Sequence, residues 1–275
     1  MSRSPAARVT LAICASLGSA LAPAWAGASW QEEATRAYAE VLRRVVTAEG
    51  RVRYAALRAE PAPLDAHLAN VAAVPAAALE AASEPDRIAF LINAYNAITL
   101  KTVAENDPIR PRGLAALRFP ANSIRQIPDA WSDRRWTVAG RTVSLDDIEH
   151  RTLRVRFSEP RIHAALVCAA LGCPPLRTEP YDGARLAEQL DDQARRYLAS
   201  PAGLQLRDGG RTVAVSAIFT WFAADFDSVG GVRAFLARHA PDAARAALAD
   251  AGTRIAFLDY DWSLNEAPPA NPDRR

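Results

Sequence analysis

Along most of the chain, apolar residues recur every three or four positions, which is the period of an α-helix with one buried face. This pattern predicts amphipathic helices at residues 30–47, 182–198, 232–239 and 242–251. An Ala-rich run at residues 64–79 predicts a further helix. Pro75 interrupts it, because proline lacks the backbone donor and clashes with the preceding turn.

One predicted helix is apolar on every face and is therefore expected in the core. It follows Ser83, a good N-cap residue with Asp86 three positions later, and its apolar run covers residues 88–100. Asn93 and Asn96 interrupt this run on the same side, one turn apart. A buried amide without partners costs about 1–3 kcal/mol, so both need hydrogen bonds. They either bind neighbouring loops to this helix or face a polar pocket.

Short alternating segments around glycine turns predict two β-hairpins. The hairpins comprise residues 135–138 with 141–144 and residues 204–206 with 212–215, and a late strand follows at residues 253–258. Ser144 is expected to cap the helix after the first hairpin, with Asp147 at its N3 position. Helices separated by hairpins are typical of the α+β class. The predicted fold is a single, mostly helical domain with two β-hairpins and a late C-terminal strand.

Residues 1–26 have the three parts of a secretory signal peptide. Arg3 and Arg8 supply its positive start, and residues 9–21 form a short apolar core. The motif Ala24-Trp25-Ala26 predicts cleavage after the second alanine. The protein is therefore predicted to be periplasmic or secreted.

The expected mature chain has a balanced charge. Removal of residues 1–26 takes away two of the 33 basic residues and none of the 31 acidic ones. Such a balance gives no electrostatic reason to expect nucleic acid or anionic lipid as a partner. No apolar run approaches the ~20 residues of a membrane span. One domain is expected at residues 27–265, followed by a disordered, Pro-rich tail at residues 266–275.

A segment with two cysteines stands near the middle of the chain. His163 lies at the start of a predicted helix, residues 162–171, which Gly172 and two prolines end. If Gly172 adopts the left-handed conformation of a Schellman cap, the helix end places Cys168 against Cys173. The pair then lies within disulfide reach, and an oxidising compartment favours the bond. A disulfide between Cys168 and Cys173 is therefore predicted.

Two cysteine-based activities fit this segment less well. A thiol oxidoreductase usually carries C-x-x-C at a helix N-terminus, where the helix dipole lowers the thiol pKa. Here four residues separate the cysteines, at a predicted helix C-terminus that disfavours the thiolate. A cysteine hydrolase would need Cys168 or Cys173 as a free thiol near a histidine. It is the alternative if the disulfide does not form.

Four separated segments combine aromatic, amide, acidic and histidine side chains. They are Phe90–Ala97 (FLINAYNA), Ser144–His150 (SLDDIEH), Arg161–Pro175 and Tyr260–Asn265 (YDWSLN). In this order, over about residues 80–265, they resemble the DUF547 family of uncharacterised proteins. One local departure is Ala164, where a phenylalanine is expected after the histidine. The resemblance implies a shared fold and a common site near these segments, and it implies no activity.

Two of the histidines could belong to a zinc site. His150 and His163 could bind zinc together with Asp146 or Glu149. However, the chain lacks H-E-x-x-H, and two lone histidines are more often structural residues than ligands. No metal or other cofactor is therefore predicted. The sequence also lacks a Gly-rich phosphate loop and a G-x-S-x-G nucleophile elbow.

The remaining candidates form one predicted site of polar side chains in apolar surroundings. The predicted catalytic residues are His163, His150, Asn93 and Asn96, and the predicted binding residues are Tyr95 and Asp146. Asp146 precedes His150 by one helical turn and could hold its imidazole. A histidine can act as a general base, and an asparagine amide can stabilise an oxyanion.

This site predicts a hydrolase-like activity on an envelope or extracellular substrate, with an unknown small molecule or envelope component as the partner. The alternative is a non-catalytic ligand-binding or structural module of the cell envelope. A histidine within hydrogen-bond reach of Asn93 in an open cleft would favour the enzyme. Full burial of both residues would favour the module.

Overall fold

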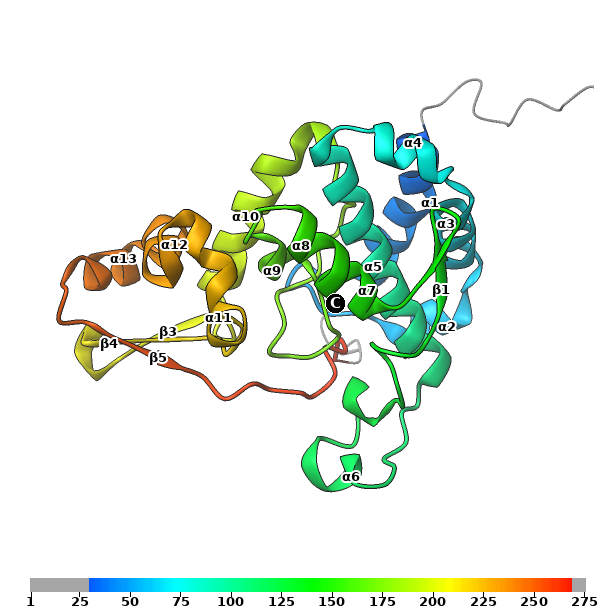
Figure 1. The fold of residues 1–275 in the computed structure, drawn as a ribbon. Coiled ribbons are helices and arrows are strands. Elements are labelled where there is room, and N and C mark those ends of the chain that lie inside the picture. Colours follow the sequence, from blue (N-terminus) through cyan, green and yellow to red (C-terminus); the bar gives the residue numbers. More distant parts are fainter. Residues whose placement is uncertain (1–29, 269–275) are drawn as a thin grey trace, which may run out of the picture.

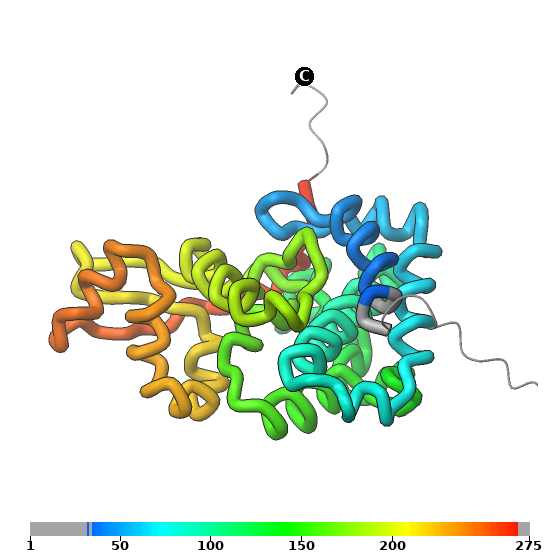
Figure 2. Tube along the Cα trace, turned by 90° about the horizontal axis from the view of Figure 1, so that it is seen from above, coloured from blue at the N-terminus to red at the C-terminus, as the bar shows by residue number. Residues whose placement is uncertain are grey.

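The computed structural model describes residues 30–268, which form a helical body and a smaller lobe at one end (Figures 1 and 2). The predicted signal peptide lies outside the described residues. We call residues 30–199 the helical body, residues 200–257 the sheet lobe and residues 258–268 the return segment. The predominance of helices over two small sheets confirms the predicted α+β class.

The helical body contains most of the helices and the first hairpin. In chain order its elements are α1 (Trp30–Val45), α2 (Tyr54–Ala59), α3 (Ala62–Ala73), α4 (Ala76–Ala81), α5 (Glu84–Asn106), α6 (Ala115–Arg118), η1 (Ile124–Gln126), β1 (Trp136–Val138), β2 (Arg141–Val143), α7 (Leu145–Ile148), η2 (Glu149–Leu153), α8 (Arg154–Arg156), α9 (Ile162–Ala165), η3 (Gly183–Arg185) and α10 (Leu186–Ala199). Pro75 separates α3 from α4, as predicted.

Helix α5 is the central element of the body, and α1, α2, α3, α7 and α10 all contact it (Figure 1). Ser83 caps it by accepting a hydrogen bond from the Asp86 amide, and residues 88–100 are buried, as predicted. The Asn93 amide exchanges two hydrogen bonds with the backbone of Tyr181, at 2.8 and 2.9 Å. Asn93 therefore binds a neighbouring loop, which was the first of the two interpretations, and it also lines a cavity of about 360 Å³.

Asn96 explains why the predicted helix at residues 162–171 is wrong. Its amide donates to the Ala165 carbonyl at 3.0 Å and accepts from the Val167 amide at 2.9 Å. A longer helix would need these backbone groups for its own hydrogen bonds. Helix α9 consequently ends at Ala165, and the chain continues as a loop in which Ala169 has a φ of +61°.

The first hairpin is formed as predicted and leads into a distorted helix. Thr137 pairs with Thr142 in the antiparallel β1–β2 ladder. Ser144 and Asp147 form the predicted capping box at the start of α7. The next turn, η2, is a π-helix, and α8 continues after it. Such wide turns occur frequently at functional sites.

The sheet lobe is a three-stranded sheet covered by helices. Its elements are β3 (Leu204–Arg207), η4 (Asp208–Gly210), β4 (Thr212–Val215), α11 (Ile218–Trp221), η5 (Ala223–Val229), α12 (Gly231–His239), α13 (Asp242–Ala249) and β5 (Arg254–Phe257). Strand β4 is central, antiparallel to β3 and parallel to β5. Phe219, Phe226 and Phe235 pack on one another in the core of this lobe.

The return segment brings the chain back to the body. Leu264 pairs with Ala170, and Glu266 pairs with Val52 near the start of the described chain. The prediction of a disordered tail from Glu266 is wrong at its first residues, because the Val52 carbonyl also accepts a hydrogen bond from the Ala267 amide at 2.8 Å. Within residues 30–268, no helix combines the length and apolarity needed to cross a bilayer.

Replacement of Asn96 by alanine is expected to lower the free energy of unfolding by about 2–4 kcal/mol, because it leaves two buried backbone groups without partners. Asn106→Ala is the matched control on α5, since Asn106 is only partly buried and bonds a carbonyl of its own helix. It should cost less than about 1 kcal/mol. Urea unfolding of both variants measures the difference. Equal losses would contradict the role given to Asn96.

Candidate functional site

A cavity of about 530 Å³ lies where the body, the lobe and the return segment meet. We call it the histidine cavity, because His150 and His163 both line it. The body also contributes Tyr95, Asp146 and Glu149. Trp221 and Phe222 come from the lobe, and Tyr260 and Trp262 come from the return segment. Its volume and mixed lining are typical of a small-molecule site.

His163 is held between an aromatic ring and a carboxylate. Its Nε2 atom lies 2.7 Å from Oδ2 of Asp225, and its ring stacks on Phe222 with centroids 4.3 Å apart. Only 3% of the His163 side chain is exposed. Burial lowers the pKa of His163 to about 4, against the opposing effect of Asp225. The imidazole is therefore neutral at pH 7.

Arg154 determines the charge and the orientation of Asp225. Its guanidinium binds both carboxylate oxygens, with Nε–Oδ2 and Nη2–Oδ1 distances of 2.5 and 2.9 Å. The hydrogen bonds from Arg154 lower the pKa of Asp225, so this group is an acceptor only. Nε2 of His163 must then carry the proton that it donates. This leaves Nδ1 as the nitrogen of His163 that can accept a proton.

Glu149 is a buried carboxyl group beside the second histidine. Burial raises the pKa of Glu149, although a hydrogen bond with Tyr95 and the nearby His150 favour its charged form. The His150 ring lies between two acids, 3.9 Å from Glu149 and 3.8 Å from Asp146. Arg154 approaches Nδ1 of His150 at 3.3 Å. The π-helical turn thus places an acid and a histidine at one wall of the cavity, and Arg154 follows directly after this turn.

Comparison with protein families comes to the same region. Residues 79–198 match the model of the family DUF547, a protein of unknown function.

This region of the chain is therefore similar to the DUF547 family.

No curated protein and no solved structure matches the chain. Three of the four segments that resembled the family lie inside the matched region, and Tyr260–Asn265 lies beyond it.

The structure brings together some of the predicted site residues and separates others. His150, His163, Tyr95 and Asp146 line the histidine cavity. Asn93 and Asn96 do not line it, and their amides bind backbone groups instead. An oxyanion role for either asparagine therefore has no geometric support.

Sequence reasoning missed three residues that this geometry involves. The sequence pattern indicates Glu149 only as a possible metal ligand and gives no role to Arg154, although Arg154 follows His150 by one helical turn. Asp225 was missed because it lies 62 residues from His163 and outside the DUF547 match. No local pattern connects two residues at that separation.

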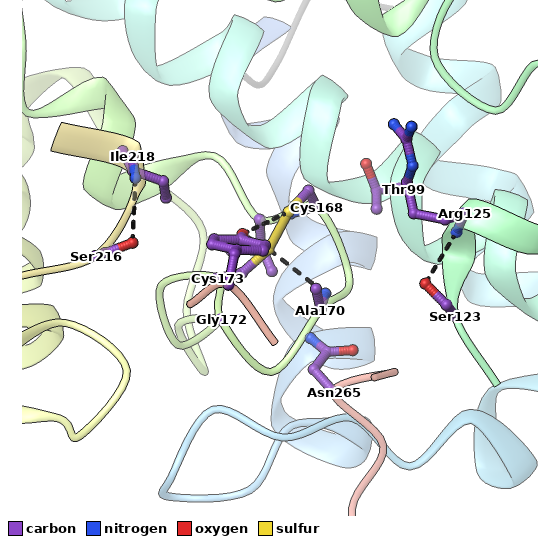
Figure 3. The surroundings of a disulfide bond; sticks show 12 residues. Thr99, Ser123, Arg125, Cys168, Ala170, Gly172, Cys173, Ser216, Ile218 and Asn265 are labelled. Atoms are coloured by element: carbon purple, nitrogen blue, oxygen red, sulfur yellow. Dashed lines mark hydrogen bonds between the residues drawn. A yellow bond between two sulfur atoms is a disulfide. The ribbon is translucent and has the colours of Figure 1, made fainter. Parts of the chain in front are cut away.

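Cys168 lines the histidine cavity and forms a disulfide, which Figure 3 shows with its surroundings. Cys168 and Cys173 are joined with their Cα atoms 6.1 Å apart. The pairing is as predicted, but a loop rather than a helix end produces it. Both sulfur atoms lie 3.1 Å from the Tyr260 hydroxyl. Tyr260 and Cys173 also line a second cavity, of about 540 Å³.

The described part of the chain contains no group of three or more His, Cys, Asp or Glu side chains arranged to hold a metal ion. The zinc set weighed from the sequence comprised His150 and His163 with Asp146 or Glu149. His150 and His163 instead have separate partners in the structure, since His163 binds Asp225.

The low pKa of His163 predicts a loss of stability in acid. The unfolded chain binds a proton near pH 6.5, whereas the folded protein resists it until about pH 4. This contribution to stability is therefore complete above pH 6.5 and is lost as the pH falls toward 4. Lowering the pH from 7 to 5 should therefore reduce the free energy of unfolding by about 2 kcal/mol.

His163→Gln is the matched variant, because its amide can still donate to Asp225 but cannot be protonated. The raised pKa of Glu149 has the opposite effect on stability, because it favours the folded protein as the pH falls. Glu149 is present in both proteins, so its effect does not alter the comparison. Urea unfolding at pH 7 and pH 5 should give a smaller acid loss in the variant. The same loss in both proteins would show that His163 does not resist protonation.

Proposed function

We propose that this protein is a hydrolase in which His163 is the general base and Glu149 the general acid of the histidine cavity. The observation that carries the proposal is the placement of both groups in one cavity, where burial favours the neutral form of each. His163 is fixed by Asp225 through Nε2, and Glu149 is buried beside Tyr95. Paired titratable groups of this kind divide the acid and base roles.

The environments of the two groups fit these roles. Burial lowers the pKa of His163 and keeps its imidazole neutral, so Nδ1 is free to accept a proton. Burial raises the pKa of Glu149, which favours the protonated form that a general acid needs. Asp225 is ionised and would stabilise the imidazolium once it forms.

The proposed step is the attack of water on the bond to be cleaved. Nδ1 of His163 takes a proton from the water as its oxygen bonds to the substrate. Glu149 gives its proton to the leaving group as the old bond breaks. Transfer of the extra proton from His163 back to Glu149, through solvent, restores both groups. His150 is suited to relay it, because its side chain is 40% exposed and lies 3.9 Å from Glu149.

Glu149→Gln is expected to lower turnover by about 10²–10⁴-fold, because the amide cannot donate a carboxylic proton. His163→Gln should have an effect of the same order. Glu188→Gln, an exposed carboxylate on α10, is the matched control and should retain activity. Purified mature protein would be assayed with p-nitrophenyl esters, p-nitrophenyl glycosides and peptide p-nitroanilides.

The rival function is a non-catalytic ligand-binding module, which the aromatic lining of the cavity and the burial of both His163 and Asn93 would also suit. Turnover by the unaltered protein that Glu149→Gln and His163→Gln abolish supports the hydrolase. Ligand binding without turnover of any substrate class supports the module. Turnover that neither variant changes contradicts the assignment of both residues.

We further propose that the protein acts outside the cytoplasm, in the periplasm or the surrounding medium. The support is the signal-like segment at residues 1–26 together with the disulfide of Cys168 and Cys173. Disulfides persist in oxidising compartments and are rare in the cytosol. An envelope or extracellular component is then the expected substrate.

The natively expressed protein is expected to begin at Gly27. Its intact mass should be lower than that of the reduced chain by two hydrogen atoms, because of the disulfide. Mass spectrometry before and after reduction and alkylation measures both features. Retention of Met1 would contradict export through this signal. Two alkylated cysteines without prior reduction would contradict the disulfide and would restore the cysteine hydrolase as an alternative.

A further inference from the structure

We infer that Arg125 binds an anionic group of the substrate, a carboxylate or a phosphate, at the wall of the histidine cavity. That this anion belongs to a substrate depends on the hydrolase proposed above. The anion site itself is inferred from Arg125 and its neighbours. Arg125 lines the same cavity as His150 and His163. Neither the DUF547 match nor the proposed acid–base mechanism gives it a role.

The backbone that carries Arg125 is fixed. Arg125 belongs to η1, and Ser123 caps this turn by accepting the Arg125 amide at 3.1 Å. The neighbouring Gln126 is buried, and its amide donates to the carbonyls of Ala115 and Phe119 at 3.0 and 3.1 Å. Figure 3 shows the Arg125 side chain extending away from Ser123. The loop therefore presents this side chain from a defined position.

Three aromatic rings hold the guanidinium. Its central carbon lies 4.5 Å from the ring centre of Phe119, 5.2 Å from that of Trp262 and 5.6 Å from that of Trp131. The rings come from three separate parts of the chain, so their arrangement depends on the folded protein. Contacts with π faces stabilise the cation but leave its N–H donors unused.

Arg125 has no acidic partner within residues 30–268, and its guanidinium makes no hydrogen bond with a described residue. Other arginines near the cavity differ, since Arg154 binds Asp225 and Arg161 binds Glu159 and Asp191. An exposed arginine is usually a solvated surface residue. Here the rings order the Arg125 side chain before a ligand binds, which reduces the conformational entropy lost on binding.

The planar guanidinium fits an oxyanion with two parallel hydrogen bonds. Asp129 and Asp146 also line the cavity, and neither lies within ion-pair distance of Arg125. They would repel an anion placed elsewhere in the cavity. The expected substrate therefore carries its negative group at one end, at Arg125, while its scissile bond reaches His163 and Glu149.

The test is equilibrium binding of three probes of similar size, followed through the fluorescence of the cavity tryptophans. Phenylacetate and phenyl phosphate carry an anion, and phenylacetamide is the neutral match. The anions are expected to bind at least tenfold more tightly than the amide. Arg125→Gln should abolish this preference, and Arg125→Lys should retain part of it, because lysine keeps the charge without the planar fork.

Arg118→Gln is the control, since Arg118 is exposed in α6 and does not line the cavity. It should bind the probes as the unaltered protein does. Near-ultraviolet circular dichroism checks that each variant keeps its tertiary structure, and Arg125→Lys preserves the cation over the rings. Tighter binding of phenylacetate identifies a carboxylate ligand, and tighter binding of phenyl phosphate identifies a phosphate ligand.

The outcomes separate this site from the proposed hydrolase. Anion binding that depends on Arg125, without turnover of any substrate, supports the anion site and contradicts the hydrolase. Turnover that Arg125→Gln leaves unchanged, together with equal binding of the anions and the amide, overturns the anion site alone. Glu149→Gln should bind the anions normally, because Glu149 acts in the chemical step.

Discussion

One carboxylate joins the two halves of the histidine cavity. Asp225 belongs to the sheet lobe, and its oxygens bind Arg154 and His163 of the helical body. The ion pair is partly buried, so losing either partner would leave a charge poorly solvated. Both the tautomer of His163 and this polar contact between the lobe and the body therefore depend on the same group. The cavity has its chemistry only when the lobe is docked on the body.

His163 is also fixed from the opposite side, by the core. The amide of Asn96 on α5 binds the backbone at Ala165 and Val167, directly after α9. The disulfide and the Tyr260 hydroxyl then hold the following loop. Satisfying a buried amide thus determines where a short helix ends. The position of the histidine follows from that constraint.

Features that depend on neighbouring residues, such as helices and their caps, were predicted from the sequence. Features that depend on hydrogen bonds between residues far apart in the chain were not. Periodicity found the main helices, and the capping residues Ser83 and Ser144 act as expected. The helix predicted through Cys168 does not form, because Asn96 takes the backbone groups that the helix would need. His150 and His163 were found from their residue type and context, whereas Asp225 could not be, since only the fold brings it to the site. Asn93 and Asn96 are buried as predicted, but their amides bind backbone groups and do not line the histidine cavity.

The arrangement of the sheet brings the two ends of the lobe close together. Leu204 at the start of β3 and Phe257 at the end of β5 both pair with Val215, on opposite sides of β4. The points where the chain enters and leaves the lobe are therefore about 10 Å apart, two strand spacings. A short turn could bridge that gap in a related gene without disturbing α5. Such a deletion would remove Asp225, Trp221 and Phe222 together, leaving the region similar to DUF547 with both histidines but without the carboxylate partner of His163.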